Sequence, residues 1–465
     1  MEQANAIELK NITKRFGEVV ANDSVDLSVK HGEILSVLGE NGSGKTTLMN
    51  MISGIYFPDE GQIFVDGEEV SICSPKDSFA LGIGMIHQHF KLVDVLTAAE
   101  NIILGLEGKS VLDMKKVVQD IQEVTERYGF ELDPNQKIYD MSVSQKQTVE
   151  IVKMLYRGAN ILILDEPTAV LTPQETEKLF TVLRNMRDQG KSIIIITHKL
   201  NEVLALSDRV SVLRKGKYIG TVETKNATAE SLTEMMVGEK IDLNIERPDP
   251  VNPVKRLVIE NLSCVNKEGV KTLKNASMEA YGGEILGIAG IAGSGQKELL
   301  EAVAGLQMTE SGSVRYITED GEEKELLSMK PADIKKLGVA LSFVPEDRLG
   351  MGLVGSMGMT GNMMLRGYNE GRGIFANRKE PKELAEKIVD QLQVSTPSVN
   401  TPVSRLSGGN VQKVLVGREI SADPTVLMVA YPVRGLDINS SLTIYDLLNE
   451  QKKRGVAVIC VGEDL

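Results

Sequence analysis

Short apolar runs rich in β-branched side chains recur along this sequence and alternate with stretches of helical character. Three of them are residues 34–38 (ILSVL), 161–164 (ILIL) and 193–196 (IIII). A short apolar run that ends at glycine or polar residues is typical of a strand buried in a sheet. The alternation of such strands with helices therefore predicts an α/β fold with a mostly parallel sheet.

The run at 34–38 leads into a glycine-rich loop, GENGSGKT at residues 39–46, which is followed by the helix-like run 48–52. This strand–loop–helix order is the context of a P-loop. Its glycines let backbone N–H groups turn toward a polyphosphate at the positive end of a helix. We expect Lys45 to neutralise phosphate charge and Thr46 to hold Mg²⁺. The nucleotide-binding residues predicted here are Gly39, Asn41, Gly42, Ser43, Gly44, Lys45, Thr46 and Thr47.

Two acidic residues and a histidine follow the other two runs. Asp165 and Glu166 end the run ILIL, and His198 comes after IIIIT. An aspartate at this place can hold Mg²⁺ through water, and a neighbouring glutamate can polarise a water molecule that attacks a phosphate. A lone histidine is more often structural, but at a strand end beside a P-loop we assign it to the catalytic site.

A damaged copy of the P-loop, GIAGSGQK, occupies residues 290–297, with Gln296 where the lysine belongs. Three further pairs of landmarks each lie 265 positions apart: Ser142 and Ser407, Asp165 and Ala430, His198 and Glu463. The two P-loops are 251 positions apart. A single long period of this kind indicates two fused domains, and 465 residues are too many for one hydrophobic core.

A proline-broken stretch, IERPDPVNPVKR, separates the two copies. Prolines at positions 248, 250 and 253 prevent a regular element there. We therefore predict a first nucleotide-binding domain at residues 1–240, a linker at 241–255, and a second domain at 256–465.

Composition narrows the function further. The formal net charge is −13 and no block of lysine or arginine occurs, which argues against nucleic acid as a partner. The three cysteines are scattered, without metal-ligand spacing, and their most frequent role is as small buried side chains. The amino-terminal sequence has no apolar segment of a signal peptide, and no apolar run approaches the ~18 residues that span a bilayer. Any membrane role is then expected to act through partners.

The order of motifs resembles the ATP-binding cassette (ABC) family over almost the whole chain, twice. The family pattern is a P-loop, a loop glutamine, a serine motif, LILDEPT and a final histidine. The resemblance implies an antiparallel β subdomain and an inserted helical subdomain in each half. It also implies that Phe16 stacks on adenine and that Gln88 contacts Mg²⁺, with Thr46 and Asp165 as the other metal-binding residues. Gln88, Glu166, His198 and Lys45 then form the catalytic set. Without the resemblance, Phe16 is a core residue and Gln88 a plain loop residue.

ABC domains pair head to tail, so the resemblance implies that each ATP lies between one P-loop and the serine motif of the other cassette. The intact P-loop would face a nearly consensus motif at Ser407, Gly408, Gly409 and Asn410. The second site would combine the degenerate residues Gly290, Gly295, Gln296 and Ser142. Lysine, both acids and histidine are missing there, and Val143 and Ser144 replace the glycines of the facing motif. The losses gather in one composite site, which predicts one hydrolytic site per chain.

Fused, asymmetric pairs resemble ATPase subunits of bacterial sugar and nucleoside importers. The stretches IHQHFKLVDVLTAAENIILG and LYRGANILILDEPTAVLTPQE, and VPEDR followed by GLV, favour the nucleoside type served by basic-membrane-protein receptors. An importer of ribose- or galactose-type monosaccharides is the alternative. The implied partners are two membrane-spanning permease subunits and, indirectly, an extracytoplasmic substrate-binding lipoprotein. The implied place is the cytoplasmic face of the cell membrane, and the implied cofactors are ATP and Mg²⁺.

Ser144 and Thr148 depart from the glycine and arginine usual in the family, and both lie in the predicted inactive site. The sequence also ends soon after the switch position, so we expect a C-terminally shortened second domain. Two other classes compete. A soluble tandem-cassette ATPase of the ribosome usually keeps both sites and has a long charged linker, and a DNA-repair ATPase needs a coiled-coil insertion, of which no heptads are seen.

Overall fold

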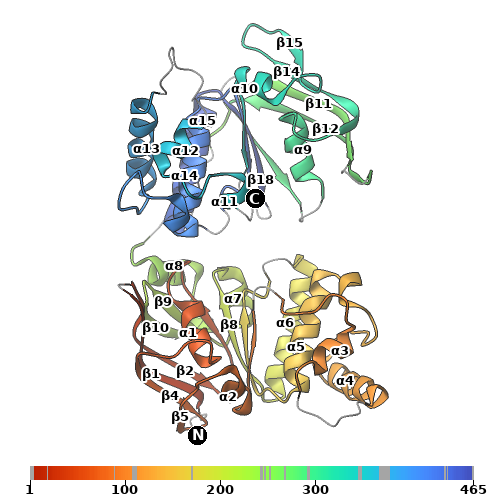
Figure 1. Ribbon diagram of the computed structural model, residues 1–465, viewed down its shortest axis with the longest axis vertical. Helices are drawn as coiled ribbons and strands as arrows, with labels where there is room; N and C mark the ends of the chain where they lie inside the picture. The colour runs from red at the N-terminus through yellow and green to blue at the C-terminus, as the bar shows by residue number, and fades with distance from the viewer. Residues whose placement is uncertain are drawn as a thin grey trace. The chain divides into compact units, whose positions relative to one another are not determined.

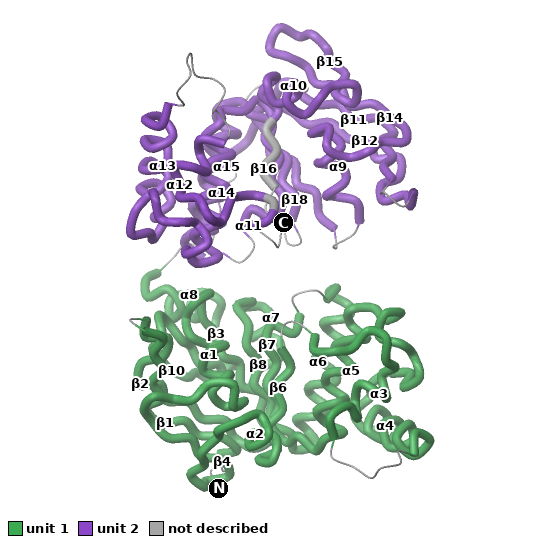
Figure 2. Tube along the Cα trace, viewed as in Figure 1, with its two compact units in different colours: residues 1–243 green, residues 244–465 purple. Residues whose placement is uncertain are grey.

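The chain forms two compact units, residues 1–243 and 244–465 (Figure 2). The computed structural model describes residues 5–17, 19–87, 90–106, 113–168, 171–240, 245, 248–250, 253–265, 269–290, 294–343, 348–365, 377–433, 436 and 438–462. Within those ranges, every helix falls short of the length and apolarity that crossing a membrane requires.

The first unit begins with an antiparallel sheet in the order β2-β1-β4-β5. Its strands are β1 (Asn5–Phe16), β2 (Val19–Lys30), β4 (Glu60–Val65) and β5 (Glu68–Val70). Apolar side chains such as Ile7, Leu9 and Ile12 are buried, while Lys10, Asn11 and Arg15 are exposed. Only one face of this sheet therefore contributes to the core.

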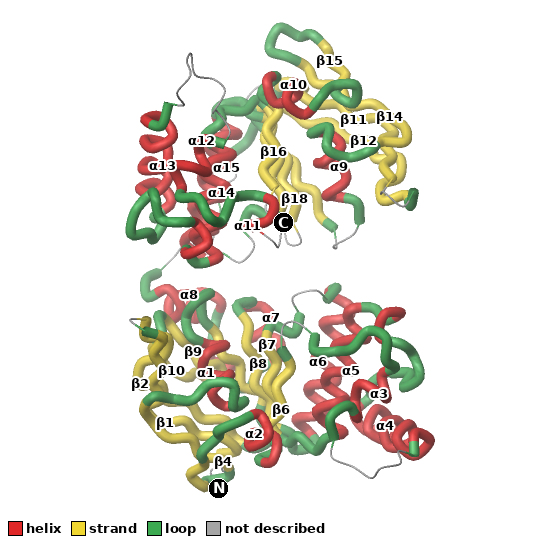
Figure 3. The backbone as a smooth tube through the Cα atoms, in the orientation of Figure 1, coloured by secondary structure: helices red, strands yellow, loops and turns green. Residues whose placement is uncertain are grey.

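A second sheet in the order β10-β9-β3-β8-β7-β6 forms the centre of the unit (Figure 3). Its strands are β3 (Ile34–Leu38), β6 (Ile83–Ile86), β7 (Ile161–Asp165), β8 (Ser192–Thr197), β9 (Arg209–Arg214) and β10 (Lys217–Glu223). The pairs from β9 to β6 are parallel, and β9 with β10 is antiparallel. Strands β3, β7 and β8 are buried along their whole length, as expected when both faces of a parallel sheet are covered. The carboxyl ends of these parallel strands lie at one edge of the sheet. The P-loop, Asp165 and His198 stand at the ends of the strands and therefore lie at that edge as well.

The described residues of the first unit form eight helices. They are α1 (Lys45–Ile52), α2 (Pro75–Ala80), α3 (Ala98–Ile103), α4 (Met114–Tyr128), α5 (Val143–Tyr156), α6 (Pro173–Asp188), α7 (Leu200–Leu206) and α8 (Ala229–Val237), with 3₁₀ turns at Ile138–Asp140 and Thr224–Asn226. Helix α1 packs between the two sheets, where Leu48 and Met49 join the largest core cluster. Helices α3, α4 and α5 build a cluster of their own around Ile102, Ile121 and Val149 (Figure 1).

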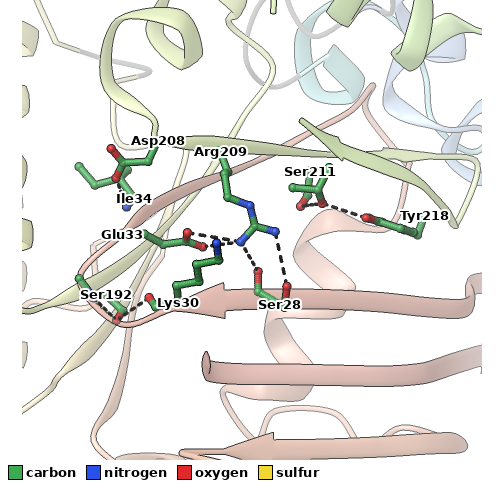
Figure 4. A network of polar contacts seen from close by, with 11 residues as sticks. Ser28, Lys30, Glu33, Ile34, Ser192, Asp208, Arg209, Ser211 and Tyr218 are labelled. Atoms are coloured by element: carbon green, nitrogen blue, oxygen red, sulfur yellow. Dashed lines mark hydrogen bonds and ion pairs between the residues drawn. The ribbon is translucent and has the colours of Figure 1, made fainter. Parts of the chain in front are cut away.

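The amino ends of the parallel strands are joined to β2 by a polar network at the edge opposite the P-loop (Figure 4). Nη1 of Arg209 lies 3.1 Å from Oε1 of Glu33, and both side chains are largely buried. Ser192 donates to the carbonyl of Lys30, and the backbone N–H of Ile34 donates to Asp208. Burial raises the pKa of Glu33, against the attraction of Arg209. This network fixes the two sheets to each other but lies away from the strand ends that carry the chemistry.

The second unit repeats the two sheets. Strands β11 (Val254–Val265), β12 (Lys271–Gly282), β14 (Thr309–Ile317) and β15 (Glu323–Glu325) pair antiparallel in the order β12-β11-β14-β15. Strands β13 (Ile285–Ala289), β16 (Val339–Phe343), β17 (Val426–Ala430) and β18 (Ala457–Gly462) pair parallel in the order β13-β18-β17-β16. In the described ranges β13 is an edge strand, and Ile285 is 36% exposed, whereas its counterpart β3 is central and buried.

The helices of the second unit follow the order of the first. They are α9 (Gln296–Val303), α10 (Pro331–Lys336), α11 (Arg348–Met351), α12 (Met359–Met364), α13 (Lys379–Leu392), α14 (Gly408–Ile420) and α15 (Ile438–Lys453), with a 3₁₀ turn at Val403–Arg405. Helices α12, α13 and α14 pack around Met363, Ile388 and Val414. The predicted fold class is confirmed: each half has a parallel core sheet, an antiparallel β subdomain and a helical subdomain.

Candidate nucleotide-binding site

The loop between β3 and α1 has the backbone that its glycines predict. Gly42 and Gly44 have φ values of 79° and 95°, in the left-handed region that favours glycine. A Cβ atom at Gly44 would lie 2.4 Å from the carbonyl oxygen of Ala21, and one at Gly39 would lie 2.3 Å from that of Leu213. Any other residue at these two positions would displace backbone.

Lys45 begins α1 and folds back over this loop. Its Nζ donates to the carbonyl oxygens of Gly39 (2.7 Å) and Glu40 (2.9 Å), and the side chain is buried. Burial lowers the pKa of Lys45 to about 8, although Glu166 and Asp165 attract its charge. A desolvated ammonium group whose hydrogen bonds among the described residues go to neutral carbonyl oxygens is well suited to bind an anionic phosphate.

A cavity of about 530 Å³ opens above the loop. It is lined by residues 19–21, 41–47, 165, 166, 196, 215 and 216. The volume lies in the range of small-ligand sites. Most of the predicted phosphate-binding residues therefore share one cavity with both acids, while Gly39 and Phe16 are not part of its lining.

Thr46 and Asp165 supply oxygen ligands of the kind that Mg²⁺ prefers. The hydroxyl of Thr46 donates to Oδ2 of Asp165 at 3.4 Å. Burial, and then repulsion by Glu166, raise the pKa of Asp165 to about 6. A bound cation would relieve both effects, so the donor set fits the predicted metal. Gln88, the third predicted ligand, lies outside the described residues.

Glu166 and His198 are brought together from the ends of neighbouring strands β7 and β8. Nδ1 of His198 lies 2.9 Å from Oε1 of Glu166, and this hydrogen bond lowers the pKa of Glu166. Because a carboxylate can only accept, Nδ1 carries the proton. Glu166 has φ 46°, and its N–H donates to the carbonyl of Ile196, which ties the turn to β8. The glutamate is therefore held ionised beside the P-loop.

Phe16 ends β1 and is 45% exposed. The ring of Tyr56 meets it edge to face, with centroids 5.2 Å apart, and Nζ of Lys14 lies 5.6 Å from its centroid. Lys14 in turn pairs with Asp59 at 2.9 Å. An exposed aromatic ring held in this way can stack on a base, whereas the core role weighed from the sequence is excluded by its exposure.

Sequence reasoning missed three residues of this site. Tyr56 supports Phe16, and the buried side chain of Asn22 donates to the carbonyl of Gly44. Gln147 on α5 donates to the carbonyl of Pro167, next to Glu166, at 2.7 Å. The repeat holds a signal for the last of these, because Gln412 stands 265 positions later and donates to the carbonyl of Pro432.

The serine motif of the second unit is open. Ser407 caps α14 and accepts a hydrogen bond from the N–H of Asn410. Gly408 is exposed, and a Cβ atom at Gly409 would have its nearest neighbour, a methyl carbon of Leu436, 3.9 Å away. The helix start thus has open space around its two glycines, while the Ser407 hydroxyl caps the N–H of Asn410.

The serine motif of the first unit is closed by its own side chains. Ser142 caps α5, and its hydroxyl also lies 3.0 Å from that of Ser144. Ser144 donates to Oε1 of Glu175 at 2.6 Å, and this bond lowers the pKa of Glu175. An ionised carboxylate at this position repels phosphate, so the substitution at Ser144 changes the chemistry of the motif as well as its shape.

The second P-loop keeps its turn but not its charge. Gly295 has φ 97°, close to that of Gly44, and Gln296 is buried at the start of α9. A Cβ atom at Gly290 would lie 2.3 Å from Nε2 of Gln296, so the side-chain amide lies against the first residue of this loop. Ala430 and Tyr431 stand at the two acidic positions, and Tyr431 keeps the same turn with φ 49°. Glu463 lies outside the described residues.

Fold and site together define a P-loop nucleotide-binding protein with two cassettes, of which the first carries the charged groups. The family model described as ABC transporter matches residues 22–169 and 273–432. The chain belongs to the ABC transporter family, as an ATP-hydrolysing subunit. The resemblance seen in the sequence is confirmed.

Three relatives add detail. The chain is 42% identical to a guanosine import ATP-binding protein of Bacillus subtilis, over 99% of this chain and 90% of the relative. It is also 42% identical to a nucleoside import ATP-binding protein of Lactococcus lactis, over 100% of this chain and 92% of the relative. A ribose import ATP-binding protein of Streptomyces avermitilis is 39% identical, over 99% and 86%.

Proposed function

We propose that this chain hydrolyses ATP at one site to drive the uptake of nucleosides through a membrane importer. The observation that carries the proposal is the ionised Glu166, bonded to His198 beside the buried ammonium group of Lys45. This arrangement provides a base, an orienting histidine and a charge for the phosphate in one cavity.

Each residue has a separate task. Lys45 and the N–H groups of the loop bind the phosphates, and Phe16 stacks on adenine. Thr46 and Asp165, together with Gln88, would hold Mg²⁺, which would supply positive charge next to the phosphates. Glu166 polarises the attacking water, and His198 positions Glu166 and senses the γ-phosphate.

The serine motif Ser407–Gly408–Gly409–Asn410 completes this site in the proposal. Its open helix start supports the assignment, because uncovered N–H groups suit a phosphate. The other composite site is proposed not to hydrolyse ATP. Gln296 brings no charge to it, and Glu175 places a carboxylate behind Ser144.

Nucleosides are proposed as the transported class because two relatives at 42% identity are named for guanosine and nucleoside import. A monosaccharide of the ribose or galactose type is the second candidate, favoured by the relative at 39% named for ribose import.

The partners in the proposal are two membrane-spanning permease subunits, with an extracytoplasmic binding lipoprotein acting through them. The subunit would lie at the cytoplasmic face of the membrane. Exposed apolar side chains on the segment 91–106 support this, since Val95 is 66% exposed, Leu104 49% and Val93 40%. The net charge of −13 is consistent with the absence of a nucleic-acid partner.

The test is to purify the tagged chain from its source membranes and reconstitute what accompanies it into vesicles that enclose ATP. We expect permease subunits to co-purify and labelled guanosine to accumulate, with excess unlabelled nucleoside competing and ribose not. Competition by ribose alone would assign the monosaccharide class. The absence of any membrane partner would contradict the importer function.

A further inference from the structure

The segment from Lys91 to Leu104 is bonded at one end to helix α5, which begins at the serine motif, and at the other end to Arg157, the residue that caps the carboxyl end of α5. At one end, the backbone N–H of Lys91 donates to Oε1 of Glu150 at 2.7 Å. At the other, the guanidinium of Arg157 donates to the carbonyl oxygens of Ile102 and Leu104 at 3.2 and 2.5 Å. The segment is therefore tied to α5 at both of its ends.

The middle of the segment is held by its own buried amide. Asn101 has no exposed surface, and its side chain accepts from the N–H of Val93 and donates to the carbonyls of Val93 and Thr97. The loop between these residues thus keeps one shape. Its exposed apolar side chains are presented on a fixed backbone.

The bond to Lys91 is made inside the protein. Glu150 is 4% exposed, and Lys153, whose Nζ lies 3.9 Å from Oε2 of Glu150, is 8% exposed. Burial lowers the pKa of Lys153, while Glu150 attracts its charge. Removing one partner from a buried carboxylate destabilises the protein far more than removing one from an exposed carboxylate. The hydrogen bond to Lys91 is therefore costly to open.

The second unit makes the same connection with different groups. By the spacing that relates Asn101 to Asn362, Gly352 is the counterpart of Lys91. Its carbonyl oxygen accepts from Nη2 of Arg418 at 3.0 Å, and Arg418 stands 265 positions after Lys153. Asn362, also without exposed surface, bonds to the backbone of Val354 as Asn101 does to that of Val93.

In the first unit the segment donates through its backbone to a side chain of the helix, and in the second unit a side chain of the helix donates to the backbone of the segment. The same connection made by different groups points to a role for the connection itself. We propose that Glu150 is a positioning residue that transmits displacement between the serine motif at Ser142 and the segment 91–104, on which the permease docks. The docking partner rests on the proposed function. Because α5 is a continuous helix, a movement at Ser142 must carry the Lys91 end of the segment with it as long as the bond to Glu150 holds.

Three variants test the bond in the assembled transporter in vesicles. Glu150→Leu with Lys153→Met removes the acceptor together with the buried charge that it neutralises. Lys91→Pro removes the donor while keeping Glu150 and Lys153, at a residue whose side chain is exposed; it also fixes φ at this position. Glu150→Gln keeps an acceptor oxygen and is the rescuing variant, and Glu126→Leu on α4 is the matched control for an exposed acid of the same subdomain.

Basal ATP turnover, uptake per ATP hydrolysed, and hydrogen exchange of the segment are measured for each. We expect the double variant and Lys91→Pro to keep basal turnover within about twofold. Uptake per ATP should fall at least tenfold and the segment should exchange faster, while Glu150→Gln and Glu126→Leu resemble the parent.

Unchanged uptake per ATP in the double variant and in Lys91→Pro would overturn the proposal, and so would an equal loss in Glu150→Gln. Hydrogen exchange is also measured on the chain alone, without permease. If the segment still exchanges slowly in the double variant and in Lys91→Pro without permease, the bond between Lys91 and Glu150 does not hold the segment, and the proposal fails. If the parent protein drives no uptake, the proposed function fails, and the exchange measurement still decides on the connection.

Discussion

Oε1 of Glu166 and Nδ1 of His198 lie 2.9 Å apart, although the two residues stand 32 positions apart in the chain. The two parallel strands β7 and β8 end side by side, and this brings the pair together. The bond keeps Glu166 ionised and turns its carboxylate toward the cavity that also holds Lys45. The catalytic assignments depend on this relationship.

Glu166→Gln should reduce ATP turnover by roughly 100- to 10,000-fold, because an amide cannot accept the proton of the attacking water. ATP binding should persist, since Lys45 and the loop are unchanged. Steady-state turnover and equilibrium nucleotide binding measure the two effects separately. A turnover within a few-fold of the parent would remove Glu166 from the role of base.

Asp165→Asn should stabilise the protein when nucleotide and Mg²⁺ are absent. The pKa of Asp165 is raised to about 6 in the folded chain from an ordinary value of 3.8, so its ionised form is penalised by folding. The penalty is complete above pH 6 and vanishes below pH 4. We therefore expect a gain of about 1–3 kcal/mol at pH 7.5 that disappears as the pH falls to 4.

Asp59→Asn is the control of opposite sign. Hydrogen bonds from Lys14 and from the N–H of Arg15 lower the pKa of Asp59, so its replacement should reduce stability at neutral pH. Urea unfolding at several pH values measures both variants. A loss of stability for Asp165→Asn at pH 7.5 would show that the buried carboxylate is not under strain.

Gly409→Asp should abolish hydrolysis by placing a carboxylate against the γ-phosphate. The site within its own unit has room for the side chain, since the nearest atom lies 3.9 Å from the added Cβ, so misfolding is not the expected cause. The matched change Ser144→Asp, made with Glu175→Gln to avoid two facing carboxylates, should cost much less. Equal losses of ATP turnover in the two proteins would refute the model of a single hydrolytic site.

Phe16→Ala should raise the KM for ATP roughly 5- to 50-fold with little change in kcat. A rise of this size corresponds to the binding free energy that an aromatic ring contributes by stacking on a base. Tyr56→Ala should raise it about threefold, because an edge-to-face partner contributes less than the stacking ring. Phe57→Ala, at an equally exposed aromatic neighbour, is the control. An effect on kcat alone would place the pair outside adenine binding.

Much of this fold could be predicted because its signals are local. The strands β3, β7 and β8 are continuous apolar runs, and the glycines at 42 and 44 require the turn that they form. The repeat extends the prediction to the second half, because a spacing of 265 positions relates its serine motif, strand end and switch position to those of the first, and a second P-loop precedes them.

Contacts between residues distant in sequence could not be predicted. Tyr56 reaches Phe16 from the far end of α1, and nothing near either residue signals the pair. Glu175 lies 31 residues from Ser144, and its bond depends on how α6 packs beside α5. The role of Ser407 to Asn410 remains a prediction, because it depends on the other cassette. The role of Gln88 also remains a prediction, because this residue lies outside the described residues.

The central claim is that ATP is hydrolysed in the first composite site alone. Lys45→Ala and Gln296→Ala change the same position of the two P-loops, and ATP turnover and nucleoside uptake are measured for both in reconstituted vesicles. The account predicts that Lys45→Ala abolishes turnover and uptake, while Gln296→Ala leaves each within about threefold of the parent, because only Lys45 brings a charge to phosphate. Comparable losses in the two variants, or turnover that survives in Lys45→Ala, would contradict it.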